Sequence, residues 1–232
     1  MTGPLTSISA TARKPSNFTD MERRKKKNKK RIIYQHAGSS SNSGSPDTGS
    51  VLLSKSLEEH ILISTAKQCI AAGITPERAG VILYTVHQKQ LYIGMAVDSA
   101  SHDLTDFGGR IYYDADLNCI TGSLREFHEE TLGIFDPISP DLVDDYTTVY
   151  DNNNLIMFLH LNINPNTVSE KFLTIHNKHV TLMGDSAHRN LEVCGITWLT
   201  ISTFIAAVGK YGTIYERVRK VLQHVKDWRQ VF

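Results

Sequence analysis

The sequence has few features of a secreted or membrane-embedded protein. Its 232 residues include 3 cysteines, which are widely separated and show no CxxC spacing. This pattern argues against a disulfide framework and against a zinc knuckle. No run approaches the roughly 18 apolar residues of a membrane span, and the first residues lack the apolar stretch of a secretory signal. These absences predict an intracellular, cytoplasmic protein with no membrane partner.

Charge is distributed unequally along the chain. The net charge is +1, but residues 1–31 hold 10 basic side chains against Asp20 and Glu22, which gives +8 and leaves −7 (15 basic, 22 acidic) for the rest. Residues 1–50 lack hydrophobic periodicity and end in the polar mixture "SSSNSGSPDTGS". We therefore expect a disordered basic arm and linker over 1–50 and a folded domain with an N-terminal helix over 51–232.

The basic residues are densest in "ERRKKKNKKR", residues 22–31. Like charges packed this closely favour a partner rich in phosphate, so the arm predicts nucleic-acid binding or nuclear targeting. A solvated, solubilising tail is the alternative. The candidate RNA-binding residues are Arg23, Arg24, Lys25, Lys26, Lys27, Lys29, Lys30 and Arg31.

Hydrophobic patterns after the linker predict an α/β (α+β) fold. A helix is expected from Ser54 to Ile70, with Gly73 as its stop. Expected strands are 80–86, 91–97, 155–163 and 191–199, the first two forming a hairpin through "HQKQ". Residues 99–109 are expected to be a loop, 118–132 a helix, and the segment after 199 helical. This order indicates a mixed central sheet with helices packed on it.

The most informative segment is "GGRIYYDADLNCITGSLREFHEETLGIF", residues 108–135. At about 100° per residue, Glu126, Glu129 and Glu130 share one face of the expected helix. The residues expected on the opposite, core-facing side are Ile120, Leu124 and Phe127. Arg125 can pair with Glu129, but one guanidinium cannot neutralise three carboxylates.

Two explanations of this acidic face are open. Acidic helix faces are common and are usually solvated. The preceding "DFGG" favours a second explanation, because glycine lets backbone carbonyls approach closely. Several carboxylate oxygens and a carbonyl form a hard, oxygen-rich site suited to Mg²⁺ or Mn²⁺. A divalent cation would then supply the missing positive charge.

These residues resemble the signature of the Nudix hydrolases. "REFHEE" fits every defined position of the family's core hexapeptide, and a glycine pair precedes it. The resemblance extends over residues 78–232 and includes "EVCGITWL" and the closing helix "IYERVRKVLQHV"; a fainter similarity is to Nudix proteins of large DNA viruses. It implies a Nudix-type α/β/α sandwich that uses Mg²⁺ or Mn²⁺ to hydrolyse a pyrophosphate bond in a nucleoside diphosphate linked to another group.

The resemblance also implies roles for the residues of the box. Glu126, Glu129 and Glu130 match the metal ligands, and the carbonyl of Gly109 is a further ligand. Either Glu129 or Glu130 would activate the water. Arg125 would orient the glutamates.

Side chains outside the hexapeptide have two interpretations each. Glu192 is an additional acid of the site or an ordinary exposed residue at the start of a strand. Phe107 and Tyr112 flank the glycine pair, where they would either stack on a base or be buried.

Three departures separate this box from the family pattern. From Gly109 to Arg125 is a step of 16 positions, two more than usual, and the closing glycine comes one position late. The early glutamate, which in the family pairs with the arginine, falls at Leu117. Asp114 or Asp116 is a candidate substitute. Loss of the early glutamate would reduce catalytic efficiency more than it would reduce metal binding.

Three functions are compatible with these observations. The first is a pyrophosphohydrolase acting on capped mRNA (decapping) or on RNA 5′ ends, in which the basic arm holds the RNA. The second is a hydrolase of free nucleotides or dinucleoside polyphosphates. The third is a non-catalytic Nudix-like RNA-binding or scaffold protein, favoured by the long loop and opposed by the intact "REFHEE".

Overall fold

The computed structural model describes residues 62–184 and 191–232. In these residues a single sheet has the order β1 (Leu62–Thr65), β6 (Thr147–Tyr150), β7 (Asn154–His160), β2 (Arg78–His87), β3 (Gln90–Asp98) and β4 (Leu104–Thr105). Two more strands join it: β5 (Phe107–Arg110) pairs with β2, and β8 (Val193–Thr200) pairs with β3. The β2–β7 pair is parallel and the other pairs are antiparallel, so the sheet is mixed.

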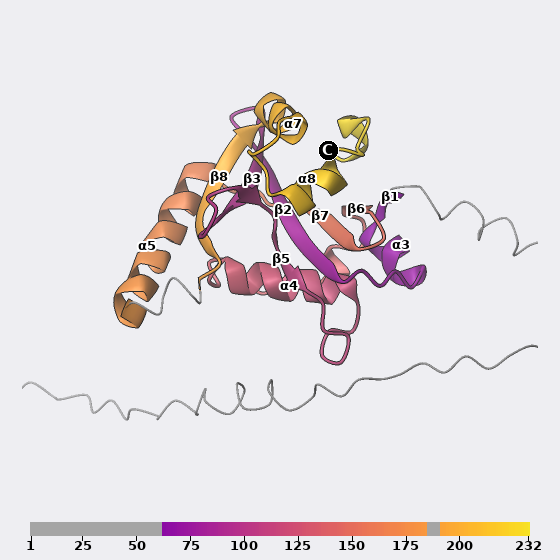
Figure 1. Ribbon diagram of the computed structural model, residues 1–232, viewed down its shortest axis with the longest axis horizontal. Coiled ribbons are helices and arrows are strands. Elements are labelled where there is room, and N and C mark those ends of the chain that lie inside the picture. The colour runs from indigo at the N-terminus through magenta and orange to yellow at the C-terminus, as the bar shows by residue number, and fades with distance from the viewer. Residues whose placement is uncertain (1–61, 185–190) are drawn as a thin grey trace, which may run out of the picture. The chain divides into compact units, whose positions relative to one another are not determined.

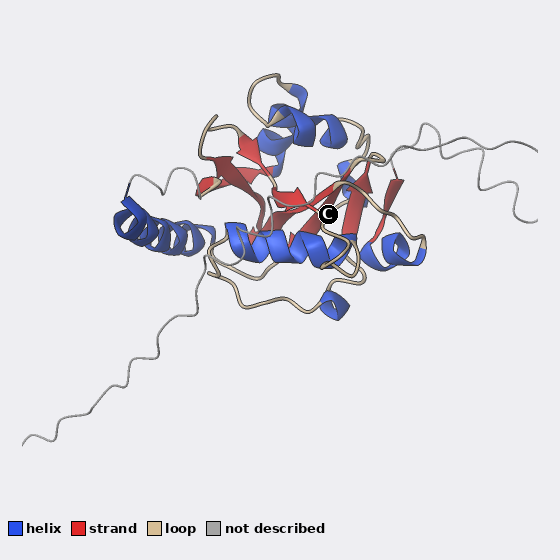
Figure 2. Cartoon of the chain, turned by 60° about the horizontal axis from the view of Figure 1, so that its bottom comes forward, coloured by secondary structure: helices blue, strands red, loops and turns tan. Residues whose placement is uncertain are grey.

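Helices cover both faces of this sheet (Figures 1 and 2). One layer contains α3 (Ala66–Ala71), α4 (Cys119–Glu130) and α5 (Pro165–Met183), which share one hydrophobic cluster. The other contains α7 (Ile201–Gly209), α8 (Glu216–Leu222) and the 3₁₀ turn η3 (Trp228–Gln230). A further 3₁₀ turn, η1 (Pro140–Leu142), follows α4. The predicted fold class, an α/β/α sandwich with a mixed central sheet, is confirmed.

Strand β2 shows why the sheet needs both layers. Val81 and Leu83 are fully buried in the α4 layer, whereas the intervening Ile82 is fully buried in the α8 layer. Successive side chains of a strand point to opposite faces, so a continuous apolar run requires cover on both sides. The β2–β3 hairpin predicted from the sequence is confirmed; Gln88 and Lys89 in its turn have φ of 51° and 66°. Such a turn matches the twist of the strands it joins.

The helix expected from Ser54 to Ile70 is wrong for residues 62–65 and confirmed for residues 66–70; residues 54–61 lie outside the described part of the chain. Residues 62–65 form β1, in which Ile63 pairs with Val149 of β6. The helix begins at Ala66, because the Thr65 side chain accepts a hydrogen bond from the Gln68 backbone and caps it. Tertiary pairing with β6 overrides the helical spacing of the apolar residues here. The expected stop at Gly73 agrees with the structure, where this residue has φ +64°.

The loop expected over residues 99–109 is confirmed for residues 99–103 but wrong beyond them, since residues 104–105 form β4 and residues 107–109 belong to β5. These strands have only 2 and 4 residues, too few for an alternating pattern to be visible. Helix α5 was not predicted either; of its 19 residues, 3 are buried, so its periodicity is weak. The basic arm, the linker and the proposed RNA-binding residues lie outside the described residues.

Within residues 62–184 and 191–232, no helix combines the length and the apolar character that crossing a membrane requires.

Candidate active site

Helix α4 has the apolar and acidic sides that the sequence predicted. The Asn118 side chain accepts hydrogen bonds from the backbone of Ile120 and Thr121, at 3.0 and 2.9 Å, and so starts the helix. Ile120, Leu124 and Phe127 are buried in the core. Their burial fixes the rotation of α4, and with it the direction in which the glutamates project.

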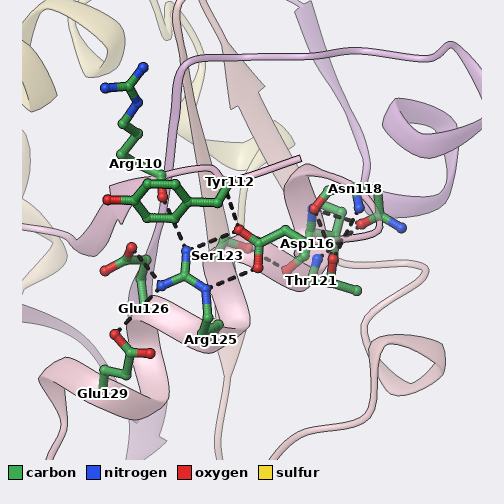
Figure 3. Close-up of polar contacts among 10 residues, drawn as sticks. Arg110, Tyr112, Asp116, Asn118, Thr121, Ser123, Arg125, Glu126 and Glu129 are labelled. Atoms are coloured by element: carbon green, nitrogen blue, oxygen red, sulfur yellow. Dashed lines mark hydrogen bonds and ion pairs between the residues drawn. The ribbon is translucent and has the colours of Figure 1, made fainter. Parts of the chain in front are cut away.

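Arg125 lies at the centre of a network of acceptors (Figure 3). Its Nε and Nη2 donate to the two oxygens of Asp116, at 2.9 and 3.0 Å. Its Nη1 donates to Glu126 Oε1 at 2.8 Å and lies 3.5 Å from Glu129 Oε2. Nη2 also donates to the carbonyl of Arg110, at 3.1 Å. The guanidinium therefore ties the loop before α4 to two of the three glutamates and to strand β5.

The two aspartates considered as substitutes for the early acid differ sharply. Asp116 is 5% exposed, makes the bidentate pair with Arg125 and accepts a hydrogen bond from the Tyr112 backbone at 2.9 Å. The hydrogen bond from Arg125 lowers the pKa of Asp116. Asp114 is exposed and has no ion pair with Arg125 among the described contacts. Leu117, which occupies the family position, is 90% exposed.

The glycine pair of β5 allows two close approaches. A Cβ added to Gly108 would collide with the Cα of Gly80 on β2, so only glycine lets these strands pack here. A Cβ added to Gly109 would lie 2.5 Å from the Glu126 carboxylate carbon. The Glu126 carboxylate thus occupies the space that a side chain at position 109 would need. The structure therefore places the Glu126 carboxylate against the backbone of Gly109.

Glu130 is the most unusual carboxylate of the described residues. Its Oε2 is buried and has no hydrogen-bond partner. Burial raises the pKa of Glu130 well above the ordinary value; the nearby Asp106 carboxylate adds to this effect and Arg78 opposes it. Burial also raises the pKa of Glu126, against the effect of Arg125. A buried carboxylate oxygen without a hydrogen-bond partner is costly, which indicates a role beyond folding.

Glu192 lies near Glu126 and Glu130. Its negative charge therefore contributes to the raised pKa of both carboxyl groups. Glu192 and the three glutamates of α4 line one small cavity of about 110 Å³. The residue is itself exposed, at the chain segment that leads into β8. Of the two interpretations drawn from the sequence, the structure thus favours a position in the acidic cluster.

Sequence reasoning missed a second arginine–aspartate pair beneath the glycines. Arg78 of β2 donates to both oxygens of Asp106, at 2.7 and 2.6 Å, and to the carbonyl of Gly108 at 2.8 Å. Asp106 is fully buried and the Arg78 side chain is 12% exposed. The sequence contained a signal for this pair. If residues 106–108 are extended, Asp106 and Gly108 face one side and Phe107 faces the other, so Asp106 lies on the glycine side of the strand. Recognising β5 as a strand would have revealed it.

The aromatic residues beside the glycines separate into two cases. Phe107 is fully buried against Phe127, with ring centroids 5.6 Å apart, so it cannot stack on a base. Tyr112 is half exposed, and its ring lies 5.5 Å from the Arg125 guanidinium carbon.

A larger cavity of about 620 Å³ adjoins the cluster. Its lining includes Asp106, Gly109, Glu130 and Glu192, together with Arg110 and Arg217. A volume of this size lies within the range typical of sites for small molecules and nucleotides.

The suitability of the cluster for a divalent cation rests on its donor chemistry. No three His, Cys, Asp or Glu side chains in the described part of the chain are already arranged around one point as metal ligands would be. The oxygens present are nevertheless hard donors: the unpartnered Oε2 of Glu130, the carboxylate of Glu126 and the nearby Glu192. Such donors match Mg²⁺ or Mn²⁺.

Fold and site together define an α/β/α domain in which the acidic side of α4 lies beside a glycine strand. Among solved structures, the chain is similar to the Nudix domain of Shewanella oneidensis NrtR complexed with ADP ribose, at 12% identity and a TM-score of 0.37, covering 70% of this chain and 97% of that one. A C. elegans Ap4A hydrolase binary complex matches at 16% identity and a TM-score of 0.37, over 67% and 98%.

These similarities concern the fold and say nothing about activity, because identity and TM-score are low. No protein-family model matches the chain, and no curated protein matches it.

Proposed function

We propose that this chain is a divalent-metal-dependent Nudix pyrophosphohydrolase that cleaves a nucleoside diphosphate linked to another group. The observation that carries the proposal is the buried, unpartnered Oε2 of Glu130, close to Glu126, which lies against the glycine strand. The match of "REFHEE" to the family hexapeptide supports the same reaction.

In this proposal Glu126, Glu129 and Glu130 hold Mg²⁺ or Mn²⁺, with the Gly109 carbonyl as a further ligand. When bound, the cation neutralises phosphate charge and lowers the pKa of a coordinated water. Glu192 is a candidate additional acid. Either Glu129 or Glu130 receives the proton of the attacking water; Glu130 is partly buried with its Oε2 fully buried, whereas the Glu129 side chain is 62% exposed and paired with Arg125.

Arg125 and Asp116 are positioning residues in this proposal. Asp116 substitutes for the early glutamate of the family, because it holds Arg125 in a bidentate pair while Arg125 holds Glu126. Bidentate arginine–carboxylate pairs have a defined geometry, so Glu126 is oriented indirectly. The loop before α4, which is two positions longer than in the family pattern, therefore still allows Glu126 to be oriented.

The preferred substrate is capped RNA or another 5′-phosphorylated RNA end. The support is the basic run at residues 22–31, whose charge is opposite to the net charge of the remaining chain. Basic segments of this density bind the phosphate backbone without sequence preference. Free nucleotides and dinucleoside polyphosphates remain the alternative within the same reaction class.

A substrate panel tests the proposal. Capped RNA, free cap dinucleotide, nucleoside triphosphates and dinucleoside polyphosphates are incubated with Mg²⁺, with Mn²⁺ and with a chelator, and products are separated by chromatography. We expect turnover that the chelator abolishes. Glu130→Gln should lower this turnover by on the order of a hundredfold or more. Glu170→Gln, which changes an exposed residue of α5, is the control and should leave turnover unchanged. Absence of turnover on the whole panel would favour the non-catalytic alternative.

A further inference from the structure

Strand β8 contains a bulge where it pairs with the end of β3. The adjacent residues Val97 and Asp98 of β3 lie opposite Gly195 and Val193. Cys194 is thus an extra residue of β8. Such a bulge bends a strand and changes the direction in which the neighbouring side chains point, and bulges are frequent beside active sites. The residues that precede the bulge therefore point in directions that regular pairing would not give them.

Glu192 lies between two buried residues at this end of β8. Leu191 and Val193 are 8% and 3% exposed, whereas Glu192 is exposed. In an extended chain neighbouring side chains point to opposite sides, so burial of these two residues directs Glu192 away from the core. Glu192 lines the small cavity together with the three glutamates of α4. The position of its carboxylate therefore depends on what holds the backbone of residues 191 and 192.

Ser99, which follows β3, holds this backbone. Its hydroxyl donates to the carbonyl of Leu191 at 2.6 Å. Its backbone N–H donates to the carbonyl of Glu192 at 2.9 Å. These carbonyls belong to the two peptide groups that flank the Glu192 Cα. Ser99 therefore fixes the orientation of the backbone from which the carboxylate extends.

Ser99 is itself held in a closed turn. The carboxylate Oδ1 of Asp98 accepts hydrogen bonds from the backbone of Ala100 and Ser101, at 3.0 and 2.7 Å. The carbonyl of Asp98 accepts a hydrogen bond from the His102 backbone at 3.0 Å. These bonds fix the chain on both sides of Ser99. Its hydroxyl is therefore already in place before a ligand binds, as an effective support for a site requires.

We propose that Ser99 is a positioning residue that orients Glu192 toward the cation held by the glutamates of α4. The assignment rests on the proposed function, because it concerns the same metal site. Groups that hold a metal ligand influence metal affinity although they do not touch the metal. Ser99 contacts only the backbone of this segment, so its effect on the cation passes through Glu192.

Manganese binding tests the assignment without requiring turnover. Mn²⁺ is titrated into the full chain, and the free ion is measured by electron paramagnetic resonance. We expect Ser99→Ala to weaken Mn²⁺ binding by about tenfold, because the hydroxyl bond beside Glu192 is lost. Ser99→Thr keeps a hydroxyl and should restore the affinity. When Glu192→Gln is already present, adding Ser99→Ala should cause no further loss, since the two residues act through one carboxylate.

Ser169→Ala is the matched control. The Ser169 hydroxyl of α5 also donates to a carbonyl of β8, that of Ile196, at 3.0 Å. Neither residue lines the small cavity with the glutamates. Both alanine variants lose a serine bond to the same strand, so both should lower the urea denaturation midpoint. Only Ser99→Ala should weaken Mn²⁺ binding.

Three results would overturn the assignment: wild-type Mn²⁺ affinity of Ser99→Ala, an equal loss of affinity in Ser169→Ala, or an undiminished loss when Glu192→Gln is already present. Mn²⁺ binding that depends on Ser99, in a protein that hydrolyses nothing on the substrate panel, would keep the assignment and refute the proposed hydrolase. Absence of Mn²⁺ binding by the wild-type protein would refute both.

Discussion

Both arginine–aspartate pairs of the site bind strand β5, but they differ in burial. Arg78 with Asp106 lies beneath the glycine pair and is almost fully buried, whereas Arg125 with Asp116 lies at the rim, with 28% of the arginine side chain exposed. Each arginine also donates to a carbonyl of β5, Arg78 to Gly108 and Arg125 to Arg110. The two bonds flank Gly109, so together they hold the strand that carries the proposed backbone ligand.

The site is therefore supported by an inner pair, Arg78–Asp106, and an outer pair, Arg125–Asp116. The inner pair is part of the core and should mainly affect stability. The outer pair connects the loop to Glu126 and should mainly affect the rate. Glu130 belongs to neither pair, which leaves its buried oxygen available to a ligand.

Breaking the inner pair should have the largest effect. Asp106→Ala leaves the Arg78 charge buried without its partner, and we expect a loss of about 3–5 kcal/mol in the free energy of unfolding. Urea denaturation followed by circular dichroism measures it. Arg229→Ala, which removes an ion pair whose arginine side chain is 91% exposed, serves as the control and should be close to wild type. A similar midpoint for both variants would contradict a structural role of the buried pair.

Removing the charge of Glu130 should have the next largest effect. Glu130→Gln nearly keeps the shape, so the fold should survive while metal-dependent turnover falls by on the order of a hundredfold or more. Glu129→Gln should reduce turnover less, since that carboxylate is exposed and shared with Arg125. Initial rates over a Mg²⁺ titration decide between them. Wild-type turnover by the variant with both changes would refute the ligand assignment.

Breaking the outer pair should have a smaller effect on turnover. Asp116→Asn disturbs the orientation of Arg125 and leaves the proposed ligands in place, so we expect a decrease of about tenfold. Arg125→Ala should act similarly. The matched control is Asp114→Asn, two positions away in the same loop, which should be neutral. If Asp116→Asn is neutral and Arg125→Ala is not, the arginine acts through its other acceptors.

The two kinds of carboxylate should also give stability a pH dependence of opposite sign. The pKa of Asp116 is lowered by Arg125, so its contribution is present above the ordinary value of 3.8 and lost as pH falls through the lowered one. The pKa of Glu130 is raised by burial, which favours the protonated carboxyl in the folded protein. The contribution of this protonated form to the free energy of unfolding is therefore fully present below the ordinary pKa of 4.5 and is lost as pH rises through the raised pKa.

Urea denaturation midpoints, measured in the presence of a chelator from about pH 3 to about pH 8, check the sign of both pH dependences. Asp116→Asn should flatten the acid side of the profile, and Glu130→Gln should flatten the loss on the alkaline side. Unchanged slopes in both variants would contradict the assignment.

The smallest effect is expected from deleting residues 1–50. Turnover of a small nucleotide should hardly change, because the proposed site lies within residues 78–217. If the arm holds RNA, the deletion should weaken binding of long RNA and flatten its salt dependence. Filter binding at two salt concentrations, with full-length protein as reference, measures this. Equal RNA binding by both proteins would end the preference for an RNA substrate.

The sequence predicted those parts of the fold whose signals are local. Helix α4 has its cap, its apolar spacing and its charged side within 13 residues, Asn118–Glu130, and the β2–β3 hairpin has a turn between two apolar runs. Strands β1 and β5 depend instead on distant partners, β6 and β2. Short strands have no periodicity of their own, so their prediction failed.

The sequence by itself therefore determined the α/β class, the acidic side of α4 and the identity of the three glutamates. Only the tertiary structure decided which aspartate pairs with Arg125, that Arg78 and Asp106 form a buried pair beneath the glycines, and that Glu130 has a buried oxygen while Glu129 is exposed. The physical reason is that burial and ion pairing depend on which strands and loops pack against a helix, and spacing along the chain does not contain that information.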